Sequence, residues 1–317
     1  MNSRITRRTF LAASAAALGC AAHRQAAASV SAAPPRFDLL IIGAQVLDGT
    51  GAAPFMADIG IKGDRIEALG AIDPEQARRV IQADGLHASP GFIDIHTHSD
   101  GLILAHQTAD SRVRQGVTTE LAGNCGGSVA PLSGMDVDVR RVRMLEEDGF
   151  LAEWTDTASY FEHVEKKGIS VNQAMLTGHN TLRQNAIGMA DRRLTDDEFR
   201  GMVLELEQAL DQGTFGLSSG LEYLPGSYAP PEELKALARV VARRGGLYAT
   251  HMRDESARVL EAVDEALEVA ETTGVRLEIS HLKAAGKPNW DKQPVILEKI
   301  GAARSKGVAV LADAYPY

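Results

Sequence analysis

From Gly91 to the end of the chain, short apolar segments typical of strands alternate with segments of helical periodicity. Repeated strand–helix units place successive strands parallel in one sheet, because each helix carries the chain back across it. Two α/β architectures fit this pattern, a doubly wound sheet and a closed barrel. We expect strands at 91–98, 117–125, 171–178, 214–220, 247–252, 276–282 and 308–314.

The helices between these strands have recognisable ends. Thr195 and Glu198 have the spacing of a capping box, and an apolar face follows them. Pro231 is expected to open a second helix, and Ser256 to cap a third that ends at Gly274. Two further helices are expected in the longer segment after the second strand, at 136–148 and 157–168.

Residues 37–90 are different in character and predict a small sheet. Alternating apolar positions on both sides of Lys62–Arg65 indicate a hairpin, and no helical pattern of useful length occurs here.

The positions of the unusual residues favour a barrel over a doubly wound sheet. No Gly-x-Gly-x-x-Gly opens a helix after the strand at 91–98, so a dinucleotide-binding fold has no support. Histidines and a cysteine instead fall at the carboxyl ends of successive strands, where a barrel places its active site.

The strand that begins at Gly91 ends in Asp94-Ile95-His96-Thr97-His98. Side chains alternate along a strand, so Asp94, His96 and His98 share one face. Two imidazoles on one face can chelate a metal, and Asp94 could orient one ring from behind. The alternative is a pair of exposed or hydrogen-bonded histidines. His251 and His281, at the ends of two later strands, favour the metal.

Cys125 lies between Gly123-Asn124 and Gly126-Gly127, at the end of the second strand. The only other cysteine, Cys20, lies in the N-terminal segment, so a disulfide is not expected. A thiolate ligand and a small buried apolar side chain are the two interpretations.

Six segments together resemble the signature blocks of the N-acyl-D-amino-acid deacylases, a branch of the amidohydrolase superfamily. They are GFIDIHTHSD, GNCGGSVAP, GLSSGLEYLPG, YATHMRDE, ISHLKAAG and DAYPY, in family order, and the resemblance runs from about Phe37 to the last residue. It implies a metal-dependent-hydrolase (β/α)8 barrel over 91–317, of which seven strands are present, and a small β-sandwich begun by 37–90. It also implies zinc-dependent hydrolysis of N-acyl-D-amino acids to a carboxylate and a D-amino acid.

The resemblance assigns the metal ligands. Most superfamily members bridge two metals with a carboxylated lysine on the fourth strand, which is absent from GLSSGLEY. This branch uses a cysteine of the second strand instead, and Cys125 has that position. Cys125, His251 and His281 would then hold one tight Zn²⁺, and His96 and His98 a second, weaker metal.

The resemblance also implies residues that bind or act on the substrate. Lys283 resembles the catalytic or carboxylate-binding lysine of the family, and Tyr223 a tyrosine that contacts substrate. Arg253 and Tyr315 are weaker candidates for binding the substrate carboxylate. Glu222 is either a group behind the site or a solvated side chain. His179 and Arg183 match a family block in which Asn180 replaces the usual glycine, and no role is assigned to them.

Alternative functions remain open at this point. They are a cyclic-amide hydrolase such as a dihydroorotase or hydantoinase, a dipeptidase, and an inactive metal-binding remnant. In the family the general base is an aspartate at the end of the eighth strand, which we expect beyond Tyr317. We therefore expect this chain to be a fragment or the product of a truncated gene, and residues 34–317 alone to be poorly soluble and inactive.

The N-terminal residues 1–33 resemble a twin-arginine signal, with Arg7-Arg8, Phe10-Leu11 and an alanine-rich run that ends at Ala33. The export machinery would thus be a partner, and the protein periplasmic or otherwise exported. Lipidation at Cys20 is a less favoured alternative. No apolar run reaches the ~20 residues of a membrane span. Removal of 1–33 takes four arginines and no acid, changing the formal charge from −9 to −13. Such acidity argues against a nucleic-acid partner.

Overall fold

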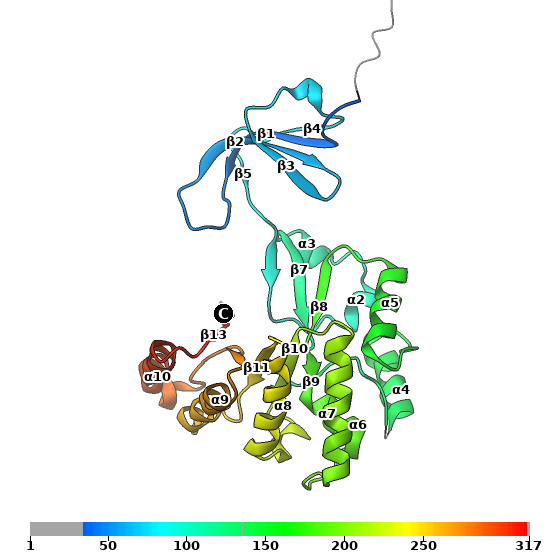
Figure 1. Cartoon of the computed structure of the whole chain (residues 1–317), viewed down its shortest axis with the longest axis vertical. Helices are drawn as coiled ribbons and strands as arrows, with labels where there is room; N and C mark the ends of the chain where they lie inside the picture. The colour runs from blue at the N-terminus through cyan, green and yellow to red at the C-terminus, as the bar shows by residue number, and fades with distance from the viewer. Residues whose placement is uncertain (1–33, 135, 316–317) are drawn as a thin grey trace, which may run out of the picture. The chain divides into compact units, whose positions relative to one another are not determined.

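The computed structural model describes residues 34–134 and 136–315. The chain divides into two compact units, one up to Pro90 and one from Gly91 (Figure 1). The predicted export signal and its alternative lipidation site lie outside the described residues. Within the part described, no helix is both long and apolar enough to cross a membrane.

The first unit is a single five-stranded sheet with the order β3-β2-β1-β4, and β5 also pairs with β1. Its strands are β1 (Leu39–Val46), β2 (Phe55–Lys62), β3 (Arg65–Gly70), β4 (Val80–Gln82) and β5 (His87–Ala88), with a 3-10 turn η1 (Pro74–Gln76). The predicted hairpin is confirmed, since antiparallel β2 and β3 are joined at Gly63-Asp64. A small apolar core of Ala44, Val46, Ile59 and Ala83 lies against the sheet.

The second unit contains the predicted run of parallel strands, each shorter than expected. They are β6 (Phe92–Asp94), β7 (Val117–Ala122), β8 (Asn172–Met175), β9 (Thr177–Gly178), β10 (Gly216–Gly220), β11 (Leu247–His251), β12 (Arg276–Ile279) and β13 (Val310–Ala312). The pairings are β6-β7-β8 and β9-β10-β11-β12-β13, all parallel. Spatial order therefore follows chain order, as in a (β/α)8 barrel and unlike a doubly wound sheet.

The predicted third strand is divided in two. Residues of β8 pair with β7, whereas β9 pairs with β10, and Leu176 lies between them. The amide of Leu176 donates to the carbonyl of Ala122, and the amide of Phe215 to the carbonyl of Met175. These bonds connect both sets of strands through one continuous segment.

Helices follow the strands and cover the outer face of the sheet (Figure 1). They are α2 (Leu102–Ala105), α3 (Asp110–Val113), α4 (Val137–Asp148), α5 (Thr157–Lys167), α6 (His179–Ile187), α7 (Asp196–Asp211), α8 (Pro231–Arg243), α9 (Val259–Thr273) and α10 (Gln293–Ser305), with 3-10 turns η2 (Gly226–Tyr228) and η3 (Lys287–Lys292). The apolar faces of α7 to α10 form the main core against β10 to β13. A second core surrounds Trp154 and Tyr160, between α5 and β8.

The helix ends agree with the sequence at the starts of α7 and α8, the latter at Pro231, and at the end of α9, and they differ at the start of α9. Both halves of the capping box of Thr195 and Glu198 are present, and α9 ends at Gly274 in the left-handed conformation. The predicted cap at Ser256 is wrong, because α9 begins only at Val259. The carboxylate of Asp254 accepts hydrogen bonds from the amides of Ser256 and Arg258, which holds this segment as a turn before the helix.

Candidate metal centre

The carboxyl ends of β6, β7, β11, β12 and β13 bring the predicted site residues together. His96 and His281 each lie two residues after their strand, and Cys125 lies three residues after β7. His251 is the last residue of β11, and Asp313 follows β13 directly. Residues far apart in the sequence therefore meet at one edge of the sheet, as a barrel with its site at this edge requires.

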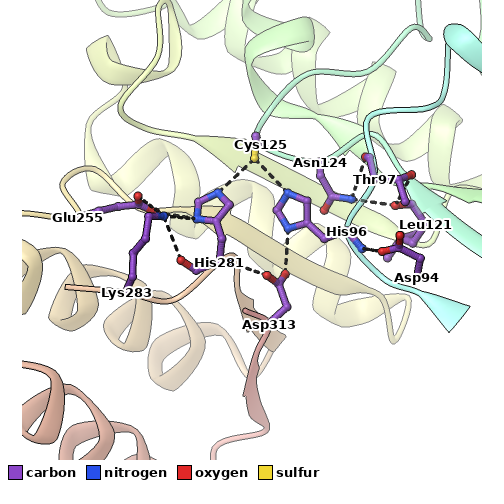
Figure 2. Close-up of polar contacts among 10 residues, drawn as sticks. All are labelled: Asp94, His96, Thr97, Leu121, Asn124, Cys125, Glu255, His281, Lys283 and Asp313. Carbon is purple, nitrogen blue, oxygen red and sulfur yellow. Dashed lines mark hydrogen bonds and ion pairs between the residues drawn. The ribbon is translucent and has the colours of Figure 1, made fainter. Parts of the chain in front are cut away.

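A thiol and two imidazoles form the centre of this group. The Sγ of Cys125 lies 3.3 Å from Nε2 of His96 and 3.5 Å from Nε2 of His281, so that Cys125 lies between the two rings (Figure 2). In tetrahedral zinc with Zn–S of about 2.3 Å and Zn–N of about 2.0 Å, sulfur and nitrogen ligands lie about 3.5 Å apart. The three residues thus fit a metal in both chemistry and spacing.

A second group overlaps the first. His251, Glu255 and His281 offer ligand atoms within 4.8 Å of one another, and the rings of His251 and His281 have centroids 4.4 Å apart. Of the predicted trio of Cys125, His251 and His281, the structure places Cys125 beside His281 but groups His251 with Glu255. His281 is common to both groups.

His98 lies at the edge of the centre. Its ring centroid is 5.4 Å from that of His96, its side chain is exposed, and it belongs to neither of the two groups of ligand atoms. Although the residue is exposed overall, part of its ring is covered by neighbouring groups; this burial, followed by the neighbouring imidazoles, lowers the pKa of His98, so this ring is neutral near pH 7 and able to bind a cation.

Asp313 contacts both of the histidines beside Cys125, one through its ring and the other through its backbone. Its Oδ2 lies 2.9 Å from Nδ1 of His96, and its Oδ1 accepts from the backbone amide of His281 at 2.6 Å (Figure 2). A proton on Nδ1 of His96 leaves the lone pair of Nε2 directed at Cys125, as carboxylate–histidine–metal arrangements do. The prediction that Asp94 orients a ring is wrong. Strand β6 ends at Asp94, the alternation stops there, and its Oδ1 accepts from the backbone amide of His96 instead.

A second carboxyl group lies beside Asp313 in the strand β12. Glu278 is buried, and burial followed by the charge of Asp313 raises its pKa to about 9, so it is neutral. Burial is the largest influence on Asp313 and acts to raise its pKa, but the hydrogen bonds with His96, Glu278 and the amide of His281 together outweigh burial, and the net pKa is lowered. Asp313 is therefore the ionised member of the pair.

Glu255 connects His281 to Lys283 and was missed by the sequence analysis. Its Oε1 lies 2.6 Å from Nδ1 of His281, and its other oxygen forms an ion pair with Nζ of Lys283. Burial acts to lower the pKa of Lys283, but hydrogen bonds with Glu255 and Tyr315 outweigh it, and the ammonium stays charged. The signal in the sequence was an acid four residues after His251 in the loop at a strand end.

The thiol of Cys125 is protonated in the absence of a cation. Burial, followed by the charges of Asp313 and Glu255, raises its pKa to about 12. A bound cation supplies the opposite charge that favours the thiolate. Ionisation of the Cys125 thiol therefore depends on metal binding.

Aromatic and acidic side chains line the outer part of the site. The ring of Tyr223 lies 4.5 Å from that of His251, and its side chain is half exposed. Glu222 places Oε2 at 2.9 Å from Nε2 of His251, which favours its interpretation as a group behind the site. The ring of Tyr315 lies 5.2 Å from Nζ of Lys283. Tyr223 therefore lies beside His251, and Tyr315 beside Lys283 and His281.

Arg253 has a different position from the one the sequence predicts. Its Nε and Nη2 bind the two carboxylate oxygens of Glu265 at 2.9 Å each, and its guanidinium also donates to the carbonyls of Ser227 and Ala229. The guanidinium is committed to the loop after β10 and to α9, so a role in binding the substrate carboxylate is not supported.

His179 and Arg183 form a buried ion-pair cluster with Glu233 of α8. Glu233 Oε1 lies 2.8 Å from Nε2 of His179, and Nη1 of Arg183 donates to both of its oxygens. The three side chains join α6 to α8 and stand apart from the centre around Cys125.

Comparisons with known proteins agree with this arrangement. Residues 79–311 match the model of the amidohydrolase family. The chain is 36% identical to a D-aminoacylase and 39% identical to an N-acyl-D-glutamate deacylase, both from Alcaligenes xylosoxydans xylosoxydans, over 89% of its length. It covers 57% of the length of each. A crystal structure of N-acyl-D-glutamate deacylase from Bordetella bronchiseptica, complexed with zinc and a phosphonate inhibitor, matches with a TM-score of 0.83 at 35% identity, over 89% of this chain and 59% of that one.

Proposed function

Since the chain belongs to the amidohydrolase family, we propose that its site hydrolyses N-acyl-D-amino acids to a carboxylate and a D-amino acid, with zinc as cofactor. The observation that carries this proposal is Cys125, a thiol at the end of the second strand, 3.3 and 3.5 Å from two imidazoles. The strand β10 and the residues after it, Gly216 to Tyr223, contain no lysine that could bridge two metals. The D-aminoacylase and N-acyl-D-glutamate deacylase among the similar proteins support the same reaction class.

The tight zinc in this proposal is held by Cys125, His281 and His251, and a second, weaker position lies toward His96 and His98. The buried Nδ1 of His251 has no hydrogen-bond partner among the described residues, and a buried polar atom of this kind is satisfied by a ligand. Cys125 lies within reach of both positions.

Two substitutions separate the two positions. His251→Asn is expected to remove most of the zinc that copurifies with the protein, whereas His96→Asn is expected to keep it. Metal analysis with the opposite result would assign the tight site to His96, Cys125 and His281, the group that contains the thiol between two imidazoles.

Zinc bound at this centre would polarise the amide carbonyl and lower the pKa of a bound water to about 7. The side chains around it bind and orient the substrate. Lys283 presents a charged ammonium beside the centre, suited to the carboxylate of an N-acyl amino acid. Tyr223, beside His251, and Tyr315, beside Lys283, are proposed to contact the substrate as well.

A substrate panel tests the reaction class. Zinc-loaded protein in a form that includes an eighth strand with its general base is expected to hydrolyse N-acetyl-D-amino acids in preference to their L-enantiomers, and to leave dihydroorotate and hydantoin intact. Turnover of the cyclic amides alone would favour a cyclic-amide hydrolase. Full zinc content without turnover of any amide would favour a metal-binding protein without catalytic activity.

We further propose that residues 1–33 direct export by the twin-arginine route. Arg7-Arg8, Phe10-Leu11 and the alanine-rich run support this proposal. A reporter fused to residues 1–33 is expected to reach the periplasm, and replacement of Arg7 and Arg8 by lysine to retain it in the cytoplasm. Export that survives the paired replacement would contradict the twin-arginine route. Loss of lipid labelling in Cys20→Ala would establish a lipoprotein.

A further inference from the structure

The loop that carries Cys125 has an unusual backbone. Gly123, Cys125 and Gly126 have φ values of 75°, 51° and 78°, all in the left-handed region. Cysteine has a Cβ, so it is disfavoured there, at a cost of order 1–3 kcal/mol. Such a conformation persists only where surrounding contacts determine it.

The hydroxyl of Ser218, on the strand β10, bridges this loop. Its Oγ accepts a hydrogen bond from the amide of Gly126 at 3.0 Å and donates to the carbonyl of Gly123 at 2.5 Å. The two bonded groups flank Cys125, one on each side. Ser218 is 0% exposed, so water cannot replace its hydroxyl at either group.

The loop is also closely packed against its neighbours. A Cβ at Gly123 would lie 2.1 Å from the carbonyl oxygen of Leu176, and one at Gly126 would lie 2.3 Å from Oδ1 of Asn180. The backbone at these two glycines therefore lies against the strands beside it. The hydroxyl of Ser218 is the side-chain group that joins the two ends of the turn.

The next residue offers a matched comparison. Ser219 is also 0% exposed, and its hydroxyl also has two partners, Oη of Tyr248 at 2.7 Å and Oγ1 of Thr250 at 2.8 Å. Side chains alternate along a strand, so Ser219 faces the helical layer, where Tyr248 packs in the apolar core. Both serines stabilise the strand β10, but only Ser218 contacts the Cys125 loop.

We propose that Ser218 is a positioning residue that holds Cys125 in the conformation required to bind the metal. The thiol is aimed at His96 and His281 because the turn around it is closed by this hydroxyl. The inference rests on the proposed function only in taking Cys125 as a metal ligand.

Metal affinity and thiol reactivity of purified Ser218→Ala and Ser219→Ala proteins test this inference. Ser218→Ala is expected to bind Zn²⁺ about 10-fold more weakly or worse, the usual effect of removing a group that orients a ligand. Its cobalt form is expected to lose intensity in the thiolate-to-metal charge-transfer band. In the metal-free protein, iodoacetamide should alkylate Cys125 faster, as measured on the Cys125 peptide by mass spectrometry. Ser219→Ala is expected to lower thermal stability and leave all three measurements unchanged.

Equal metal affinity and equal alkylation rates in the two variants would overturn the inference, whatever the activity of the protein. If Ser218→Ala yields no folded protein, Ser218→Thr is used instead, because threonine keeps the hydroxyl. This variant is expected to retain the metal affinity of the parent protein. A large loss of metal affinity in Ser218→Thr would also contradict the proposal. The proposed function fails separately, if the parent protein binds zinc through Cys125 and hydrolyses no N-acyl-D-amino acid.

Discussion

Two carboxylates near the metal centre, Asp313 and Glu255, each contact two other groups of the site. Asp313 binds the ring of His96 and the backbone of His281, and Glu255 binds the ring of His281 and the ammonium of Lys283. Each shared carboxylate therefore couples the position of one group to that of the other. A substitution at Asp313 or Glu255 is expected to move two groups of the site.

Replacement of Asp313 by asparagine tests the first of these couplings. Asparagine keeps the size of the side chain but loses the negative charge that favours a proton on Nδ1 of His96. Metal affinity at the position beside His96 is expected to fall 10–100-fold. Competition with a chelating dye measures this, with circular dichroism to show that the fold is kept. Unchanged affinity at both positions would mean that Asp313 has only a structural role.

Lys283→Met removes the ammonium at similar side-chain length. We expect a large loss of turnover on N-acetyl-D-amino acids with the zinc content unchanged, because Lys283 contacts Glu255 and the ring and carbonyl of His281 but not Cys125. Steady-state kinetics and metal analysis on the same sample provide the two measurements. Normal turnover would make Lys283 a bystander.

At the scale of elements, α7 shows how local sequence determines a boundary. The hydroxyl of Thr195 accepts from the amide of Glu198, and the carboxylate of Glu198 accepts from the amide of Thr195 and from Arg192. Thr195→Ala is expected to lower the free energy of unfolding by about 1 kcal/mol, the usual cost of losing a cap of this kind. Chemical denaturation measures the change.

The capping carboxylate also predicts a dependence on pH. The hydrogen bonds of Arg192 and then of the Thr195 amide lower the pKa of Glu198 to about 2, below its value of about 4.3 in an unfolded chain. The contribution of Glu198 to stability is therefore present above about pH 4.3 and is lost as the pH falls towards 2. Glu198→Gln should destabilise the protein at pH 7 and much less near pH 3. Asp196→Asn, in the same turn but outside the capping pair, is expected to lack this trend.

The order of the strands could be predicted from the sequence, because it follows from the alternation of strand and helix periodicities alone. The ends of the helices and strands were harder to predict. The cap of α9 was misplaced because Asp254 accepts hydrogen bonds from the amides of Ser256 and Arg258, which holds these residues in a turn before the helix. The division of the third strand at Leu176 depends on which neighbour each short segment meets. Both features are set by contacts in space that no local pattern contains.

Most residues of the site could be predicted from the sequence, but the contacts between them could not. Ligand-type residues at strand ends and the resemblance to a family identified His96, Cys125 and His281, which the structure brings together. Arg253 was misjudged because its partner, Glu265, lies on α9 and joins it only in the folded chain. Glu255 was missed because an acid in a loop has no distinctive pattern until His281 and Lys283 lie beside it.

At the scale of the whole molecule, the metal centre brings together residues from the ends of β6, β7, β11, β12 and β13. A metal bound to the folded state alone adds stability, about 2.7 kcal/mol at a free metal concentration 100-fold above the dissociation constant. Chelation is therefore expected to lower the unfolding temperature of the parent protein, as measured by calorimetry. Cys125→Ala is expected to be insensitive to the chelator. Equal shifts in both proteins would place the stabilising metal elsewhere.

The strand order, which follows the chain, also has a consequence for biosynthesis. Within the second unit a ribosome releases β6 and β7 first, so each later strand finds its neighbour already present. His281, however, comes 156 residues after Cys125. At roughly 5–20 residues per second, Cys125 emerges on the order of 10–30 s before the imidazole that completes its surroundings. During that interval, Cys125 of the nascent chain lacks the imidazole of His281. The complete metal centre can form only after His281 has been synthesised.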